Sequence, residues 1–273
     1  MTIQVEILEF LHYNPSSSRV EISAGLTEAP NERTLKRIIA ELVQNGDVIV
    51  EGKGKATRYS LSAQAHLMMP LNIDTYFIKD IDERKVQESF NFQLIQDVLP
   101  RVTLFTPEEK IRLESAHKEF LANMETLSDL EYRKEMERLG VDLSWKSSQI
   151  EGNTYSLLET ERLLKEKQTA QGKTKEEAIM LLNHKDALDF ILDNPDYLKE
   201  LSVRRLEDIH SILTKELGVG NGIRKRRVGI TGTNYRPLDN EFQIREALED
   251  TCQLINGKEN VFEKALLILV LLS

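Results

Sequence analysis

The stretch NERTLKRIIAELVQNGDVIVEGKGKATRYSL, residues 31–61, contains a helix pattern followed directly by a hairpin pattern. An apolar stripe at helical spacing consists of Leu35, Ile38, Ile39, Leu42 and Val43. The helix is predicted to begin after the N-cap residue Asn31 and to end at Asn45-Gly46. Two β-prone runs then flank a turn rich in glycine and lysine, which predicts a β-hairpin.

Two shorter helices are predicted ahead of this stretch. Ile3, Ile7 and Leu11 share one helical face, and Asn14-Pro15 should stop that helix. The run RVEISAGL, residues 19–26, predicts the second. The order of helix, helix, capped helix and hairpin is typical of a winged helix-turn-helix domain, which we place at residues 1–62.

The third helix carries a basic face that could bind DNA. Arg33, Lys36 and Arg37 are spaced by three and four residues, so they lie together, opposite the apolar stripe. Lys53 and Lys55 fall at the predicted tip of the hairpin. A helix fits the major groove of double-stranded DNA, and a hairpin tip can reach the adjacent phosphates. The alternative is a domain used only for protein contacts, with a polar face that is merely solvated.

The remainder of the chain is predicted to be almost wholly helical, so the fold class is mainly α. Residues 63–105 are too apolar for a free linker and are predicted to form a packed connector. A helical core is predicted for residues 106–273. Its helices are expected after Thr106, over about 130–150, after Ser156, after Thr174, over 202–217, over about 241–255 and over 259–273.

Composition excludes several classes of protein. The net charge of −9 argues against a chain devoted to nucleic acid, although it permits a local basic face. Cys252 is the only cysteine, so no intrachain disulfide or cysteine-based zinc site can form. We expect no signal peptide, no membrane span and a cytoplasmic location. The spacing of histidine, aspartate and glutamate residues predicts no metal site.

Glu151 stands near a predicted helix C-terminus, just before Gly152-Asn153. Unpaired carbonyl groups give a helix C-terminus a partial negative charge, so an acidic side chain there costs roughly 0.3–1 kcal/mol unless a cation faces it. Ser147 lies one helical turn earlier, on the same side as Glu151. The sequence therefore predicts a cationic partner for Glu151.

The stretch SSQIEGNTYSLLETERLL, residues 147–164, resembles the inhibitory helix of the Fic family, whose motif is Ser or Thr, three residues, Glu, then Gly or Asn. Ser147, Glu151 and Gly152 match that motif. The resemblance continues downstream, in LSVRRLEDIHSIL and in GNGIRKRRVGITGTNYRPLDNEFQIREALEDTCQLIN, and covers about residues 144–273. It implies an all-α core that carries a β-hairpin flap.

The resemblance implies a self-inhibited protein adenylyltransferase. Fic proteins typically use ATP and Mg²⁺ to move AMP onto a hydroxyl side chain of a target protein. In their signature, His-x-Phe-x-Asp/Glu-Gly-Asn-Gly/Lys-Arg, the histidine is the general base, the acidic residue holds the metal and the arginine binds the γ-phosphate. The inhibitory glutamate pairs with that arginine, so the resemblance implies that the cation of Glu151 is the signature arginine.

The resemblance also implies a target-binding flap that borders the nucleotide site. The matching positions are Ile230, Thr231, Gly232, Thr233 and Tyr235. A basic cluster, residues 224–227, precedes them and offers another partner for Glu151, although such runs are more often solvated.

The chain departs from the family at the signature, which is absent. None of the five histidines is followed by the required residues, so no catalytic residue is assigned. We expect the reading frame to continue past Ser273 into the signature. Two alternatives stay open: a DNA-binding transcriptional regulator whose core serves dimerisation or ligand sensing, and a Fic-like core that transfers another phosphate-containing group. A homodimer is compatible with each.

Overall fold

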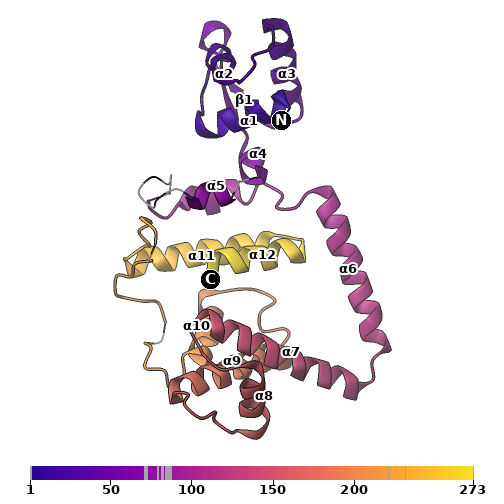
Figure 1. The fold of residues 1–273 in the computed structure, drawn as a ribbon, viewed down its shortest axis with the longest axis vertical. Coiled ribbons are helices and arrows are strands. Elements are labelled where there is room, and N and C mark those ends of the chain that lie inside the picture. Colours follow the sequence, from indigo (N-terminus) through magenta and orange to yellow (C-terminus); the bar gives the residue numbers. More distant parts are fainter. Residues whose placement is uncertain are drawn as a thin grey trace. The chain divides into compact units, whose positions relative to one another are not determined.

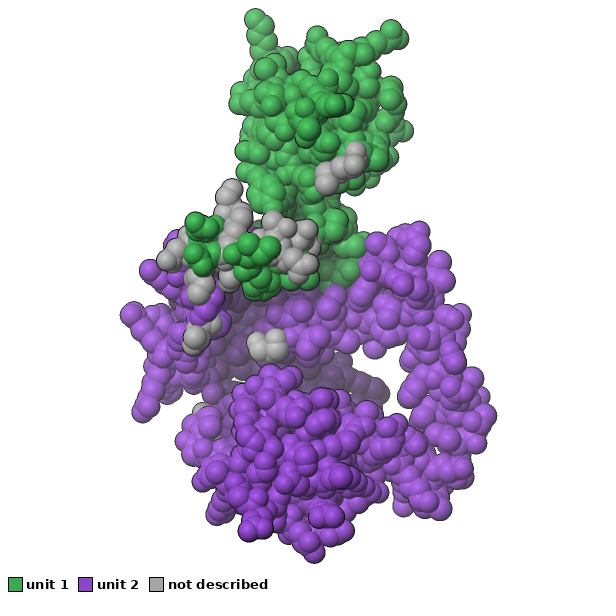
Figure 2. Space-filling view, in the orientation of Figure 1, with its two compact units in different colours: residues 1–85, 97–104 green, residues 86–96, 105–273 purple. Residues whose placement is uncertain are grey.

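The computed structural model describes residues 2–70, 73–78, 80, 83, 88–220, 222–230 and 232–272. The described chain is mainly helical, and its one sheet is a two-stranded antiparallel pair (Figure 1). The chain divides into two compact units, coloured separately in Figure 2. Unit 1 consists of residues 1–85 and 97–104, and unit 2 consists of residues 86–96 and 105–273.

Unit 1 begins with three helices and a hairpin, in the order that the sequence predicts. Its elements are α1 (Ile3–Tyr13), α2 (Arg19–Gly25), α3 (Glu32–Gln44), β1 (Val48–Glu51), the 3₁₀ turn η1 (Gly54–Ala56), β2 (Arg58–Leu61), α4 (Ala63–Met68) and α5 (Ile73–Ile78). The antiparallel register pairs Val48 with Leu61 and Glu51 with Arg58. The turn between the strands therefore holds residues 52–57.

The core of unit 1 forms where the apolar stripe of α3 meets α1, α2 and β1. Leu35 and Ile39 are buried there, together with Ile7 of α1. Asn31 caps α3, because its side-chain oxygen accepts from the amide of Thr34 at 2.9 Å. The predicted bounds of α3 are confirmed, since they follow from local cap chemistry and helical spacing.

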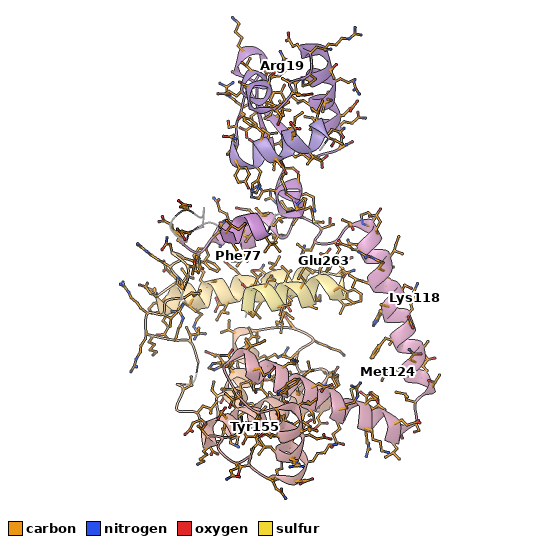
Figure 3. The ribbon with its side chains drawn as sticks, in the orientation of Figure 1. Arg19, Phe77, Lys118, Met124, Tyr155 and Glu263 are labelled. Carbon is orange, nitrogen blue, oxygen red and sulfur yellow. The ribbon has the colours of Figure 1, made fainter. Side chains whose placement is uncertain are left out.

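Unit 2 consists mostly of long helices. They are α6 (Pro107–Thr126), α7 (Asp129–Ile150), α8 (Leu157–Glu166), α9 (Lys175–Asp193), α10 (Val203–Leu213), α11 (Glu241–Gly257) and α12 (Val261–Leu272), and a π-helical turn η3 (Leu94–Val98) precedes α6 in the chain. α7 packs against α8 and α9, and α9 also packs against α10. Leu163 and Leu181 are buried among these helices with Tyr155, which Figure 3 labels.

α7 runs without a break past Gly140, where its apolar seam lies against α9. Gly140 is buried, and a Cβ atom there would lie 3.2 Å from the Lys185 side chain. The small residue therefore allows the close approach of the two helices. Ser144 and Ser148 continue this small-residue seam at one-turn intervals, and both are fully buried.

α12 packs along α11, and Leu267 of α12 is buried. The carboxylate of Glu263, which Figure 3 labels, forms ion pairs with the Nζ atoms of Lys110 and Lys258, each at 3.4 Å. Leu269 and Val270 remain exposed on another face. No helix in the described part of the chain combines the length and the apolar character that a membrane span requires.

Candidate functional site

The end of α7 is a Schellman turn centred on Gly152. The amide of Asn153 donates to the carbonyl oxygen of Ser148 at 2.9 Å, and the amide of Gly152 donates to that of Gln149 at 3.0 Å. Gly152 has a φ of +87°, the left-handed conformation that closes such a turn. Glu151 is the residue that caps the helix. The direction of the chain after Glu151 is therefore set by backbone hydrogen bonds.

Glu151 itself is exposed, and no ion pair reaches it from any residue that the structure describes. Ser147, one turn earlier, is half-buried. The described side chains provide no hydrogen bond between Ser147 and Glu151, although helical stacking places them on one side. The cationic partner of Glu151 therefore stays a prediction.

The loop after Gly152 is held by the first turn of α9. Asn153 donates from its side-chain amide to the carbonyl oxygen of Glu177 at 2.8 Å. Thr154 donates to Oε1 of Glu177 twice, from its amide at 2.8 Å and from its hydroxyl at 2.6 Å. Lys173 donates to the Thr154 hydroxyl oxygen at 3.0 Å. The loop thus depends on a carboxylate that lies more than twenty residues away.

The other oxygen of Glu177 caps α9. Oε2 accepts from the amide of Thr174 at 2.9 Å, and the Thr174 hydroxyl accepts from the amide of Glu177 at 3.1 Å. The Thr154 hydroxyl and the Thr174 and Thr154 amides donate to the charged carboxylate, and this lowers the pKa of Glu177 to about 2. The group therefore stays ionised across the physiological pH range.

A second set of hydrogen bonds, around Tyr155, also holds the loop. Trp145 of α7 donates from Nε1 to the carbonyl oxygen of Tyr155 at 2.9 Å. Tyr155 is buried, and its hydroxyl accepts from the amide of Ala170 at 3.3 Å. Asn153 closes the inner side of the turn, because its Oδ1 accepts from the amide of Tyr155 at 3.0 Å.

Sequence reasoning identified only part of this arrangement. The capping box of Thr174 and Glu177 is visible in the sequence as a threonine followed three residues later by a glutamate. The contact between Glu177 and Thr154 has no such signal, because the two residues are distant in sequence and meet only when α9 packs on α7.

The expectation of a β-hairpin flap is wrong for the described residues 222–230 and 232–240, which form no pair of strands. The backbone of Arg236 instead makes an isolated bridge with Ser89, and its amide donates to the carbonyl oxygen of Glu88 at 2.9 Å. An isolated two-stranded hairpin is marginal in water, so pairing with another segment prevails.

Among the described residues, no side-chain contact joins the predicted flap residues to the turn at Glu151. Ile230 and Gly232 are exposed, whereas Thr233 and Tyr235 are half-buried. The hydroxyl of Thr233 accepts from the amide of Tyr235 at 3.2 Å. Thr231 lies outside the described residues.

Two cations of the basic cluster at residues 224–227 have acidic partners. Lys225 lies 3.4 Å from Glu241, and Arg227 lies 2.6 Å from Asp239. No ion pair joins the cluster to Glu151 among the described residues, so a role for it as the partner of Glu151 stays a prediction.

The residues predicted to contact DNA are exposed on unit 1. Arg33, Lys36 and Arg37 lie on the exposed face of α3, and Lys53 and Lys55 lie in the turn between β1 and β2. Two acidic side chains reduce the positive charge near this face. Glu41 pairs with Arg37 within α3, and Glu32 pairs with Arg19 of α2 at 3.0 Å.

The described residues include no group of three or more histidine, cysteine, aspartate or glutamate side chains placed to hold a metal ion. Comparison of the chain with models of known protein families, with curated proteins and with solved structures gave no match.

Proposed function

We propose that the protein is a self-inhibited protein adenylyltransferase that moves AMP from ATP onto a hydroxyl side chain of a target protein. The observation that carries the proposal is the placement of Glu151. Glu151 is the C-cap residue of α7, its side chain is exposed, and it has no cationic partner within the described structure. An acid at a helix C-terminus gains most from a guanidinium, and a guanidinium held in this way cannot bind the γ-phosphate of ATP.

The residues of this chain do not fit ATP or Mg²⁺ by themselves. The signature histidine, acidic residue and arginine are absent from the sequence, and the described part offers no metal-binding cluster. No catalytic step is therefore assigned to residues 1–273. The proposal requires the reading frame to continue past Ser273 into the signature, and another sequence there would remove it.

The test uses the protein encoded by the complete reading frame. We expect Glu151→Gly to raise self-labelling from ATP labelled in its α-phosphate, because the signature arginine is then free for the γ-phosphate. The matched control is Glu166→Gly, which removes an exposed glutamate from the end of α8. Equal labelling of Glu151→Gly and the unaltered protein would contradict the proposal that Glu151 inhibits the enzyme. Labelling from a different phosphate donor would favour the transfer of another group.

A second candidate function, DNA binding by a winged helix-turn-helix domain, is favoured by the exposed basic face of α3. Helix α3 presents Arg33, Lys36 and Arg37, and the hairpin turn adds two lysines. Each phosphate contact that is lost should reduce the slope of log affinity against log salt by about 0.9. Replacing all three residues with alanine should therefore flatten the salt dependence of duplex binding by about two to three units.

The control for this experiment removes three exposed cations from α7 instead, by alanine at Arg133, Lys134 and Arg138. That variant should keep the original slope, since its charges lie in unit 2. The DNA proposal fails if the unaltered chain has no affinity for duplexes, or if both triple variants change the slope equally.

A further inference from the structure

We propose that Glu177 is a positioning residue for Glu151, acting through Thr154, so that restraint by the α7 terminus depends on a carboxylate in α9. This inference rests on the proposed function, since it concerns how the inhibitory carboxylate is aimed. It assigns to Glu177 a role beyond capping its own helix.

The side chain of Glu151 is not packed against its neighbours. Its neighbours Gln149 and Ile150 are exposed, and Ile150 is 84% exposed. Neighbouring side chains therefore do not hold Glu151 in place. The position from which its side chain leaves the chain is set by the backbone of the turn, which the Schellman hydrogen bonds hold on the α7 side.

Glu177 holds the two residues that follow Gly152. The Schellman hydrogen bonds end at the amide of Asn153. Beyond it, the backbone and hydroxyl of Thr154 both donate to Oε1 of Glu177, and Asn153 donates to the carbonyl oxygen of the same residue. Three hydrogen bonds thus join the two residues after Gly152 to one residue of α9.

Glu177 is itself held in place by contacts within α9 and by the packing of that helix. Its Oε2 accepts from the amide of Thr174, and α9 packs along α7, the helix that ends in Glu151. Lys173 donates a further hydrogen bond to the hydroxyl oxygen of Thr154. The turn is therefore held at both ends. It continues α7 on one side, and on the other side it is bonded to α9, which packs against α7.

The chain provides a matched control for the capping role. Glu131 is the third residue of α7 and accepts from the amide and hydroxyl of Ser128, at 2.9 Å and 2.7 Å, in a capping box of the same kind. Glu131 makes no hydrogen bond with the 151–155 loop among the described residues. Alanine at Glu131 therefore reports the loss of a capping glutamate that makes no contact with the loop, and Thr154→Val removes the side-chain contact with Glu177 while leaving the α9 cap in place.

The first experiment measures amide hydrogen exchange in the 273-residue chain. We expect Glu177→Ala to accelerate exchange at the amides of residues 152–155 at least tenfold, and Thr154→Val to accelerate it less. Glu131→Ala should leave these amides unchanged. Thermal unfolding monitored by circular dichroism checks that each variant is folded. If Glu177→Ala does not fold, the test uses Thr154→Val alone. Equal protection of residues 152–155 in Glu177→Ala and Glu131→Ala, or unchanged protection in Thr154→Val when it stands alone, would overturn the inference.

The second experiment measures self-labelling by the protein encoded by the complete reading frame. Glu177→Ala should raise labelling in the same direction as Glu151→Gly, and adding it to Glu151→Gly should give no further increase. A residue that only stabilised the fold would lower labelling in both backgrounds. If Glu151→Gly raises labelling and Glu177→Ala does not, the positioning role is wrong while the proposed function stands. If Glu151→Gly has no effect, the proposed function fails and the positioning role fails with it, whatever the exchange rates show.

Discussion

Gly152 holds a left-handed backbone conformation, with a φ of +87°, at the turn that follows Glu151. Apart from its two chain neighbours, no atom of the described residues lies within 4 Å of a Cβ atom added there, so the backbone conformation is what opposes a side chain. We expect Gly152→Ala to lower the free energy of unfolding of unit 2 by roughly 1–2 kcal/mol. Urea denaturation followed by the fluorescence of Trp145 measures this, and a more stable variant would contradict it.

Glu177 predicts a pH dependence of stability at the residue scale. Its pKa is lowered from about 4.5 to about 2 by hydrogen bonds from Thr154 and Thr174. The folded state therefore binds the proton more weakly than the unfolded state. This stabilisation is fully present above pH 4.5 and is lost as the pH falls towards 2.

The measurement compares the unaltered chain with Glu177→Gln by urea denaturation between pH 6 and pH 2.5. At pH 6 we expect the variant to be less stable by about 2 kcal/mol, since hydrogen bonds to a charged group are weakened. The difference should narrow below pH 4.5. A difference that stays constant down to pH 2.5 would mean that the carboxylate charge contributes nothing.

The seam between α7 and α9 supplies a prediction at the scale of the element. Ser144 is fully buried there, and its hydroxyl oxygen has no hydrogen-bond partner in the described part of the chain. A buried hydroxyl without a partner costs about 1–3 kcal/mol. We therefore expect Ser144→Ala to raise the free energy of unfolding by about 1 kcal/mol.

The companion variant Ser144→Val tests the tightness of the same seam. The extra methyl groups should overpack the contact and lower the free energy of unfolding by about 1–3 kcal/mol. We expect the change in the free energy of unfolding, measured by urea denaturation, to be positive for Ser144→Ala and negative for Ser144→Val. A destabilising alanine would show instead that the hydroxyl is satisfied in solution.

Whole-molecule stability should reflect two separate cores. Leu35 belongs to the apolar cluster of unit 1, and Leu181 belongs to that of unit 2. Alanine at either position should destabilise its own unit by about 2–5 kcal/mol. Trp145, the single tryptophan, lies in unit 2 and reports that unit alone.

We therefore expect Leu181→Ala to shift the fluorescence transition to lower urea concentration, and Leu35→Ala to leave it in place. The loss of helical circular dichroism should shift in part for both variants. A fluorescence transition that moves equally for the two variants would mean that the units unfold together.

Helix positions were largely predictable from the sequence. Asn31 caps α3, the capping boxes at Ser156 and Thr174 begin α8 and α9, and Gly152 ends α7 where the sequence places a helix C-terminus. Each of these depends on residues at most five positions apart. The hairpin of unit 1 follows from equally local alternation and turn composition.

At the candidate site, the sequence indicates the helix C-terminus at Gly152. It does not indicate the hydrogen bonds between Glu177 and Thr154, or the pairing of Arg236 with Glu88 in place of a flap hairpin. These contacts join residues that are far apart in sequence. Their formation depends on which helices pack together, and local spacing contains no record of that.

The sequence by itself determined the mainly helical character of the chain, the helix ends and the conformation of the turn at Gly152, because cap chemistry and apolar periodicity act within a few residues. Only the tertiary structure decided which carboxylate holds that turn, which acids pair with Lys225 and Arg227, and that the side chain of Glu151 is exposed. The physical reason is that hydrogen bonds and ion pairs form between groups that folding brings within about 3 Å of each other, whatever their distance along the chain.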